Sequence, residues 1–102
     1  MIVEYVRYTV PPARQTAFVE AYREAAAELR ASTHCLRYEV AQCVEEPTCF
    51  IVRIEWDSAE GHMQGFRKEP RFPSFFARVK PFFADIQEMR HYAVTDVRSP
   101  DA

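Results

Sequence analysis

The stretch RIEWDSAEGHMQGFRKEPRF, residues 53–72, decides the fold of this 102-residue chain. Charged and apolar residues alternate over residues 53–56, which is typical of a half-buried strand. Asp57 and Ser58 supply helix-capping side chains, and Asp57 with Glu60 has the spacing of a capping box, in which two side chains bond the free N–H groups of a helix start. The pattern therefore predicts a strand followed at once by a helix over residues 58–68.

One face of this predicted helix carries His62, Met63 and Phe66, because residues three and four apart are neighbours on a helix. Pro70 ends the helix, since the residue before a proline is disfavoured in the helical conformation. Trp56 is the only tryptophan, and it lies close to one of the three histidines at the strand-to-helix junction. If the chain has a small-molecule site, we expect this stretch to form one wall of it.

The composition is that of one soluble globular domain, with 48% apolar and 27% charged residues. A net charge of −2 argues against sequence-independent binding to nucleic acid and against adhesion to an anionic membrane. No apolar run is long enough to cross a bilayer, and Glu4 and Arg7 interrupt the first strand pattern. We therefore read no signal peptide and expect a cytoplasmic protein.

The three cysteines, Cys35, Cys43 and Cys49, are odd in number and lack the CxxC spacing. Cys43 and Cys49 flank a predicted turn, so they could lie close enough across the hairpin to form a disulfide. In a reducing compartment we expect all three to be free thiols instead.

The rest of the chain alternates between strand and helix patterns. In chain order we predict a strand at 2–10, a helix at 13–31, a hairpin of strands at 35–44 and 49–56, the helix at 58–68, a short helix from Pro73 that Pro81 kinks or ends, and a strand at 86–94. This order predicts an α+β fold, a ferredoxin-like β-α-β-β-α-β antiparallel sheet with helices on one face. Residues 1–98 would form a single domain, and residues 99–102 a polar tail.

Such a sheet leaves its other face open. On the last strand, we place one set of residues on one face and the alternate set on the other: Ile86, Glu88, Arg90, Tyr92 and Val94 against Gln87, Met89, His91 and Ala93. The open face mixes apolar and charged residues and is too apolar for free solvent. We therefore expect a symmetric homodimer that pairs through this face.

Several segments occur in the order found in a known family. They are VRYTVPP before the long helix, CLRYEV after it, the EEPT turn, FIVRIEWDSAEGHMQGFR, and PFFADIQEMRHY near the end. With these segments the chain resembles, along nearly its whole length, the antibiotic biosynthesis monooxygenase (ABM) domain family of the dimeric α/β-barrel superfamily. The resemblance implies a dimer whose sheets face each other, with a pocket in each protomer between the sheet and the shorter helices.

The resemblance also implies a chemistry. Characterised members oxidise electron-rich phenols, anthrones or quinols with O2 and without flavin or metal. The substrate is deprotonated to an anion that itself reacts with oxygen. Such a protein needs an aromatic pocket, a group that stabilises the anion and a proton acceptor. We therefore expect O2 as co-substrate, a small aromatic or quinol-like ligand, and no cofactor or metal.

Position by position, Trp56 matches the family's tryptophan at the end of the third strand. Some anthrone-oxidising members pair that tryptophan with an asparagine, but this chain contains no asparagine and has Val52 in that neighbourhood. Haem-degrading relatives use an asparagine, a tryptophan and a histidine where this chain has Val6, Phe66 and Phe76. Haem degradation is therefore not expected.

His62 is the general-base candidate, because imidazole titrates near neutral pH and this one is predicted beside Trp56. We expect His62 and Trp56 to be catalytic. The expected substrate-binding residues are aromatic or cationic and comprise Phe66, Phe72, Phe76, Arg53 and Tyr38.

Each candidate also has a plain structural interpretation. His62 could be a partly exposed helix residue without a role, and the Phe cluster could be ordinary core. Arg53 could pair with Glu39 or Glu88 across strands, which is the more common arrangement. We expect a structural hydrogen bond for His91, and solvated side chains for His34 and Arg67.

Three functions remain open at this point. The first is a monooxygenase acting on an aromatic or quinol-like substrate. The second is a non-catalytic module that binds a hydrophobic ligand or serves another protein. The third is a proton-transferring isomerase on the same barrel. No metal-ligand spacing, phosphate-binding glycine loop or nucleophile motif separates them.

Overall fold

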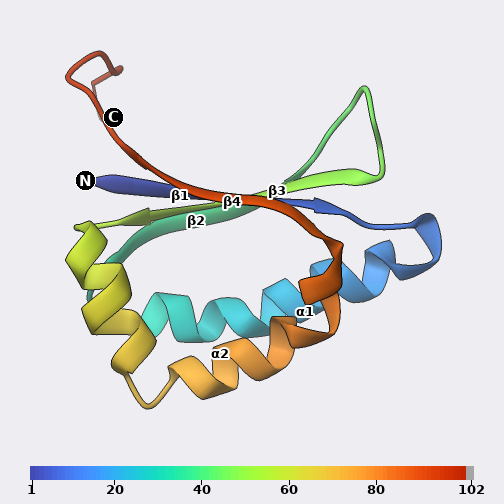
Figure 1. The fold of residues 1–102 in the computed structure, drawn as a ribbon, viewed down its shortest axis with the longest axis horizontal. Coiled ribbons are helices and arrows are strands. Elements are labelled where there is room, and N and C mark those ends of the chain that lie inside the picture. Colours follow the sequence, from blue (N-terminus) through green and yellow to red (C-terminus); the bar gives the residue numbers. More distant parts are fainter. Residues whose placement is uncertain (101–102) are drawn as a thin grey trace.

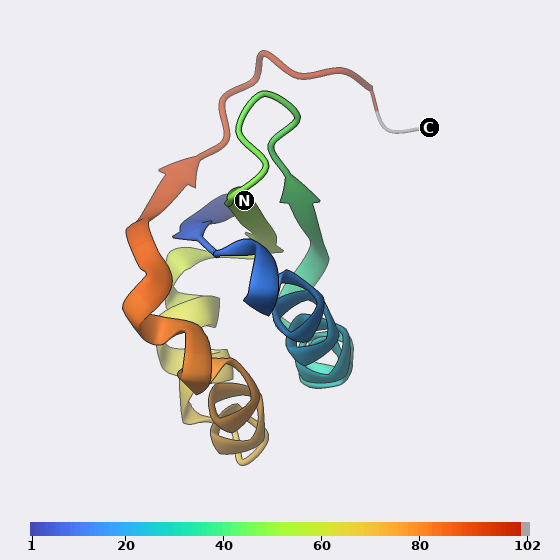
Figure 2. The ribbon, with the colours of Figure 1, turned by 90° about the vertical axis from the view of Figure 1, so that its right-hand side faces the viewer.

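The computed structural model describes residues 1–100 as a four-stranded antiparallel sheet with all its helices on one face (Figures 1 and 2). The strand order is β2 (Cys35–Gln42), β3 (Cys49–Trp56), β1 (Ile2–Thr9) and β4 (Ile86–Ala93), which is the ferredoxin-like arrangement that the sequence predicts. The last two residues of the predicted polar tail, 101–102, lie outside the described residues.

The elements follow the predicted order, with the second helical region divided. Their bounds are β1 (Ile2–Thr9), α1 (Pro12–Ala31), β2 (Cys35–Gln42), β3 (Cys49–Trp56), a π-helix η1 (Gly61–Gly65), a 3-10 turn η2 (Phe66–Lys68), α2 (Phe72–Val79), a 3-10 turn η3 (Lys80–Asp85) and β4 (Ile86–Ala93). Pro81 follows the end of α2, as expected. No helix within residues 1–100 is both long and apolar enough to span a membrane.

Helix α1 covers the sheet with one apolar stripe. Pro12 occupies the start of the helix, where its missing N–H costs nothing. The buried residues recur at helical spacing and are Phe18, Tyr22, Ala25, Ala26 and Leu29. Phe18 packs against Tyr8 and Phe50 of the sheet, with ring centroids 4.8 and 5.1 Å away. This layer closes one side of the core.

The face assignment that we predict for β4 is wrong at its first residue. Met89 lies opposite Val6 and His91 opposite Glu4, yet the register shifts so that Ile86 lies opposite Tyr8. A β-bulge inserts one extra residue and so resets the alternation of a strand. As a result Ile86, Met89 and His91 all lie on the helix-covered face, together with Glu4.

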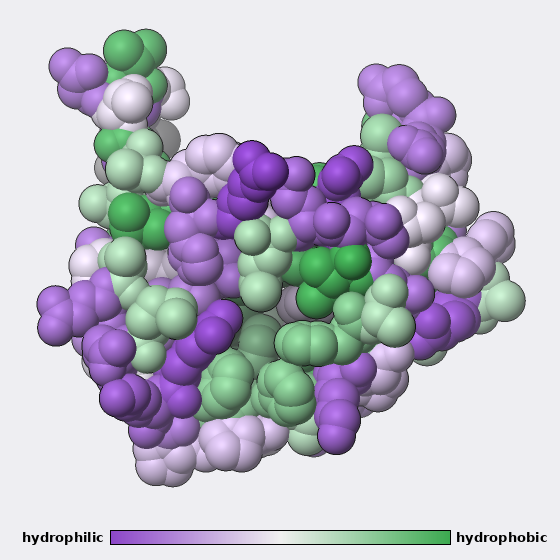
Figure 3. Space-filling view, viewed as in Figure 1, coloured by the Kyte–Doolittle hydropathy of each residue, from purple (hydrophilic) through white to green (hydrophobic). Residues whose placement is uncertain are grey.

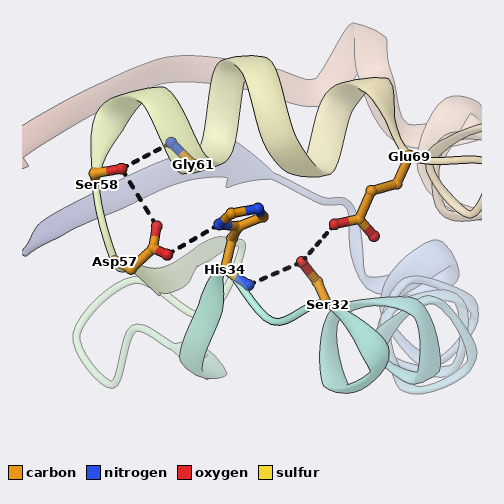
Figure 4. Close-up of polar contacts among 6 residues, drawn as sticks. All are labelled: Ser32, His34, Asp57, Ser58, Gly61 and Glu69. Atoms are coloured by element: carbon orange, nitrogen blue, oxygen red, sulfur yellow. Dashed lines mark hydrogen bonds and ion pairs between the residues drawn. The ribbon is translucent and has the colours of Figure 1, made fainter.

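The predicted capping box is also wrong. Gly61 N–H donates to Ser58 Oγ at 2.8 Å, so Ser58 is the N-cap of this helical segment. Asp57 is engaged elsewhere, because its Oδ2 lies 2.9 Å from His34 Nδ1 (Figure 4). His34 is therefore half-buried and paired, where we expect a solvated side chain.

His34 and Asp57 fix the position of η1. A Cβ atom added at Gly61 would lie 1.9 Å from Asp57 Oδ1, and one added at Gly65 would lie 2.4 Å from His34 Cδ2. Both glycines are needed so that the helix backbone can approach these side chains closely. This contact holds the segment that carries His62 against the end of the sheet.

The three cysteines are free, as expected. The hairpin brings Cys43 and Cys49 together through the backbone, since Cys43 N–H donates to the Cys49 carbonyl at 2.8 Å. The open sheet face carries Tyr5 and Tyr92, whose rings pack edge-to-face at 5.5 Å and are 37% and 45% exposed.

We predict that Gly65→Ala destabilises the fold by about 1–3 kcal/mol, the usual cost of overpacking. Helix propensity alone predicts the opposite sign, a gain of up to about 1 kcal/mol. Urea unfolding followed by circular dichroism distinguishes the two. In a His34→Ala background the contact is removed, and Gly65→Ala should then be neutral or stabilising. Gln64→Ala is the matched control. Equal effects of Gly65→Ala in both backgrounds would contradict the role given to His34.

Candidate active site

A pocket of about 120 Å³ lies between the helix-covered face of the sheet and the short helices. Its wall is mostly aromatic and includes Trp56, Phe66, Phe72, Phe75, Phe76 and Phe83. Apolar side chains gather around this hollow below the sheet (Figure 3). Phe83 and Met89 are exposed at its rim, whereas Trp56 and Phe66 are buried at its inner end. The pocket thus has a dry end and an open mouth.

Trp56 and His62 form the inner wall, and the structure brings these two predicted residues together. Their rings stack with centroids 4.3 Å apart and planes 8° from parallel. Trp56 Nε1–H donates to Glu4 Oε1 at 3.1 Å, which satisfies the indole donor inside the core. His62 is only 3% exposed, so it is not the partly exposed residue of the plain structural interpretation.

Glu4, His62 and His91 form a polar cluster at this wall. Nδ1 of His62 and Nε2 of His91 are 2.8 Å apart, which is hydrogen-bond distance. Glu4 Oε1 lies 3.6 Å from His62 Nε2, and Glu4 Oε2 lies 3.8 Å from His91 Nε2. The predicted hydrogen bond of His91 is thus present, and its partner is His62.

Burial determines the charge states in this cluster. It lowers the pKa of His62 to about 3, and the positive charge of Arg67 and the nearby His91 act in the same direction. Burial also raises the pKa of Glu4, against the opposing effects of the Trp56 hydrogen bond, His91 and Arg67. His62 is therefore a neutral imidazole near neutral pH, with one nitrogen lone pair available to accept a proton.

Two tyrosines lie at another part of the pocket wall. The hydroxyl oxygens of Tyr8 and Tyr22 are 2.5 Å apart. Burial raises the pKa of Tyr8 to about 12 and that of Tyr22 well above its ordinary value. Both hydroxyls are therefore protonated, and they bond to each other.

The predicted substrate-binding residues divide into two groups. Phe66, Phe72 and Phe76 line the pocket. Arg53 and Tyr38 do not. Arg53 lies on the open sheet face, where its Nη1 is 2.5 Å from Glu55 Oε2.

Tyr38 lies in a separate groove between α1 and β2, where its hydroxyl accepts a hydrogen bond from Arg30 at 2.6 Å. Of the two partners predicted for Arg53, Glu39 lies only at the 4.0 Å limit, and Glu88 lies 3.7 Å from Arg90 instead. Arg67 is exposed as expected, but it also lines the pocket mouth.

Sequence reasoning missed Glu4, Tyr8 and Tyr22 as pocket residues. Glu4 left a readable signal. It is the one carboxylate on the face of β1 that otherwise carries Ile2, Val6, Tyr8 and Val10. A charge in an apolar face is costly unless it is paired, so such a residue marks a polar site.

The same cluster is the arrangement in residues 1–100 that could hold a metal ion. Glu4, His62 and His91 each offer a ligand atom, and these atoms lie within 4.8 Å of one another. Two histidines and a carboxylate suit several transition metals. The direct nitrogen–nitrogen hydrogen bond, however, already pairs His62 with His91. The cluster can therefore also pass a proton between the two rings.

The sequence profile of the antibiotic biosynthesis monooxygenase (ABM) family matches residues 1–78. The chain belongs to this family. A curated relative, the uncharacterized protein YczJ of Bacillus subtilis (strain 168), is 22% identical over 92 residues, which are 90% of this chain and 97% of the relative.

Solved structures with the same fold include candidate antibiotic biosynthesis monooxygenases from two bacteria. The one from Bordetella bronchiseptica has a TM-score of 0.79 and 21% identity, covering 92% of this chain and 96% of that one. The one from Chloroflexus aurantiacus J-10-fl has a TM-score of 0.75 and 21% identity, covering 96% of both chains. Membership of the ABM family supports a general monooxygenase-like function.

The buried imidazole of this ABM protein predicts a pH-dependent stability. Because the folded-state pKa of His62 is about 3, below its ordinary 6.5, only the unfolded chain takes up this proton between those values. Above pH 6.5 His62 is neutral in both states and does not lower the free energy of unfolding. As the pH falls below 6.5, protonation of the unfolded chain lowers the free energy of unfolding.

From pH 7 to about pH 5.5 the loss should be about 1 kcal/mol, and His62→Gln should remove it. Glu4 acts in the opposite direction, since its raised pKa favours the folded state in acid. The measured quantity is thus the difference between wild type and variant in urea unfolding at each pH. If the free energies of unfolding of wild type and His62→Gln changed equally with pH, the buried, neutral state of His62 would be contradicted.

Proposed function

We propose that this protein is a cofactor-independent monooxygenase that oxidises a single-ring phenol or quinol with O2. The observation that carries the proposal is the small aromatic pocket with a buried proton-accepting cluster in its wall. Family membership supplies the reaction class. A binding site made only for apolar ligands would not need a carboxylate and an imidazole at its dry end.

The size of the pocket selects among the substrates of the family. An apolar cavity of roughly 150 Å³ accommodates benzene. The pocket here is about 120 Å³ and open at its mouth, so it has room for one ring at most, whereas a three-ring anthrone would extend through the mouth. Phe66, Phe72 and Phe76 offer faces and edges against which a ring can pack.

The overall reaction balances without an external reductant. A hydroquinone and O2 yield a hydroxyquinone and water, with one oxygen atom in each product. The O–H bond of the substrate breaks first, and the electron-rich phenolate reduces O2. The protein then has to accept a proton and stabilise an anion. His62 is the acceptor nearest the ring, and Arg67 at the mouth stabilises the phenolate.

The pKa of His62 limits how long it can hold this proton. A group with a pKa of about 3 costs about 5 kcal/mol to protonate at pH 7, at about 1.4 kcal/mol for each pH unit. The phenolate formed beside it offsets part of this cost as an ion pair. An imidazolium in this wall is therefore a transient species, and it must transfer its proton onward.

The test is O2 uptake with a panel of substituted hydroquinones and catechols, with an anthrone as the larger comparison. We expect turnover of single-ring substrates, incorporation of one ¹⁸O atom from ¹⁸O2, and slower turnover of the anthrone. His62→Gln should lower kcat by roughly 100-fold or more, the usual range for loss of a general base. Met63→Gln, which introduces the same side chain at the exposed neighbouring position outside the pocket lining, is the control.

Two other outcomes would replace this function. Tight binding of aromatics without O2 uptake would make the protein a ligand-binding module. Deuterium exchange into a bound ligand without oxidation would make it an isomerase.

We also propose that two copies pair through the open sheet face. The exposed Tyr5–Tyr92 pair and the partly buried Ile51 on that face support this. Light scattering should give twice the mass of the 11.9 kDa chain at micromolar concentration, and Tyr5→Glu should reduce it towards one copy. A monomeric wild type would contradict the dimer.

A further inference from the structure

The histidine pair links the dry inner end of the pocket to solvent. The side chain of His62 is 4% exposed and lines the pocket, whereas that of His91 is 32% exposed. Nδ1 of His62 and Nε2 of His91 are 2.8 Å apart, so one proton lies between the two rings. An imidazole can accept a proton at one nitrogen while releasing one from the other.

The dry end of the pocket has few other ways to move a proton. The hydroxyls of Tyr8 and Tyr22 are bonded to each other, and outside the polar cluster the remaining wall is apolar except for Arg67 at the mouth. Glu4 accepts the indole N–H of Trp56, and its distances to the two histidines exceed hydrogen-bond length. A proton removed from a bound ring therefore has His62 and then His91 as its connected path to water.

We propose that His62 and His91 form a proton relay that connects the bound substrate with solvent, with His91 as its outer member. The relay rests on the proposed oxygenase function. The substrate O–H breaks as an N–H forms at His62 Nε2. The Nδ1–H of His62 breaks as an N–H forms at Nε2 of His91, which releases the proton on its Nδ1 to water. The reverse sequence returns a proton to the peroxide anion that forms from O2.

The charges around the pair support this role. Glu4 Oε1 is 3.6 Å from His62 Nε2 and Glu4 Oε2 is 3.8 Å from His91 Nε2, so its carboxylate faces both rings from β1. Trp56 fixes that carboxylate from β3. Arg67 faces the cluster from η2 and opposes any lasting positive charge on His62. Glu4 is thus a positioning residue for the two rings. With Arg67 nearby, a proton taken up by His62 is passed on to His91 and is not retained.

The relay can be measured in the free protein, without turnover. Exchange of the His62 ring proton with water, followed by ¹⁵N-edited NMR, should be fast because His91 carries the proton out. His91→Gln, which keeps a side chain able to hydrogen-bond to His62, should slow this exchange at least tenfold. If His91 only holds the structure together, its replacement would loosen the site and leave the exchange unchanged or faster, which would overturn the relay.

Kinetics provide the second measurement. His91→Gln should lower kcat about 10-fold to 100-fold while KM changes less than about twofold. In His91→Ala the exposed position is vacated, and added imidazole should restore most of kcat. Glu88→Gln, on the same strand but facing away from the pocket, is the matched control. Wild-type kcat in His91→Gln, or no rescue by imidazole, would overturn the relay and leave the oxygenase intact.

The remaining outcomes separate relay and function. If wild type consumes no O2 with the whole panel, the proposed function fails, and the exchange measurement alone still decides the relay. If activity is lost on treatment with a chelator and restored by Fe²⁺, the nitrogens of His62 and His91 are metal ligands and the relay is wrong. Activity unchanged by the chelator supports it.

Discussion

The buried carboxylate of Glu4 is the constraint on which the site depends. A charged group inside a protein is costly unless charge-compatible partners surround it. Here the partners come from three other elements: the indole N–H of Trp56 on β3, His62 on η1 and His91 on β4. One residue of the central strand β1 thus fixes the relative positions of the neighbouring strands and the π-helix at the inner end of the pocket.

The π-helix is held in turn from its outer side. Ser58 caps the helical turn that leads into it, and Asp57 holds the ring of His34 beside Gly61 (Figure 4). The same ring lies against Gly65. π-helical turns are rare and frequent at functional sites. In this chain the turn places His62 flat on Trp56 and directs Phe66 into the same pocket. The same short segment therefore both anchors the π-helix and supplies residues of the pocket wall.

Much of the fold could be predicted because it depends on local periodicity. The stripe on α1 and the alternation on β1 and β3 report directly which side chains are buried. The bulge in β4 could not be predicted, since it changes the face of Ile86 through pairing with β1 rather than through any local signal. The predicted Asp57–Glu60 capping box was wrong for a similar reason, because Asp57 bonds a histidine 23 positions earlier in the chain.

The site divides in the same way. Trp56, His62 and Phe66 could be found from one stretch because they are close in sequence. Glu4 and His91 join them only through the sheet, where β1 pairs with β4. Arg53 was misplaced because a cation near Trp56 in sequence points to the opposite face of the strand from it.

The stack of Trp56 on His62 has an optical consequence. Trp56 is the only tryptophan of the chain, so all indole emission arises from one ring at the wall of the pocket. A protonated imidazole quenches indole emission by accepting an electron from the excited ring, whereas a neutral imidazole does so weakly. With planes 8° from parallel and centroids 4.3 Å apart, the pair is within contact range for this process. The protein thus contains its own label, and its fluorescence reports the charge of the histidine that the proposed chemistry uses.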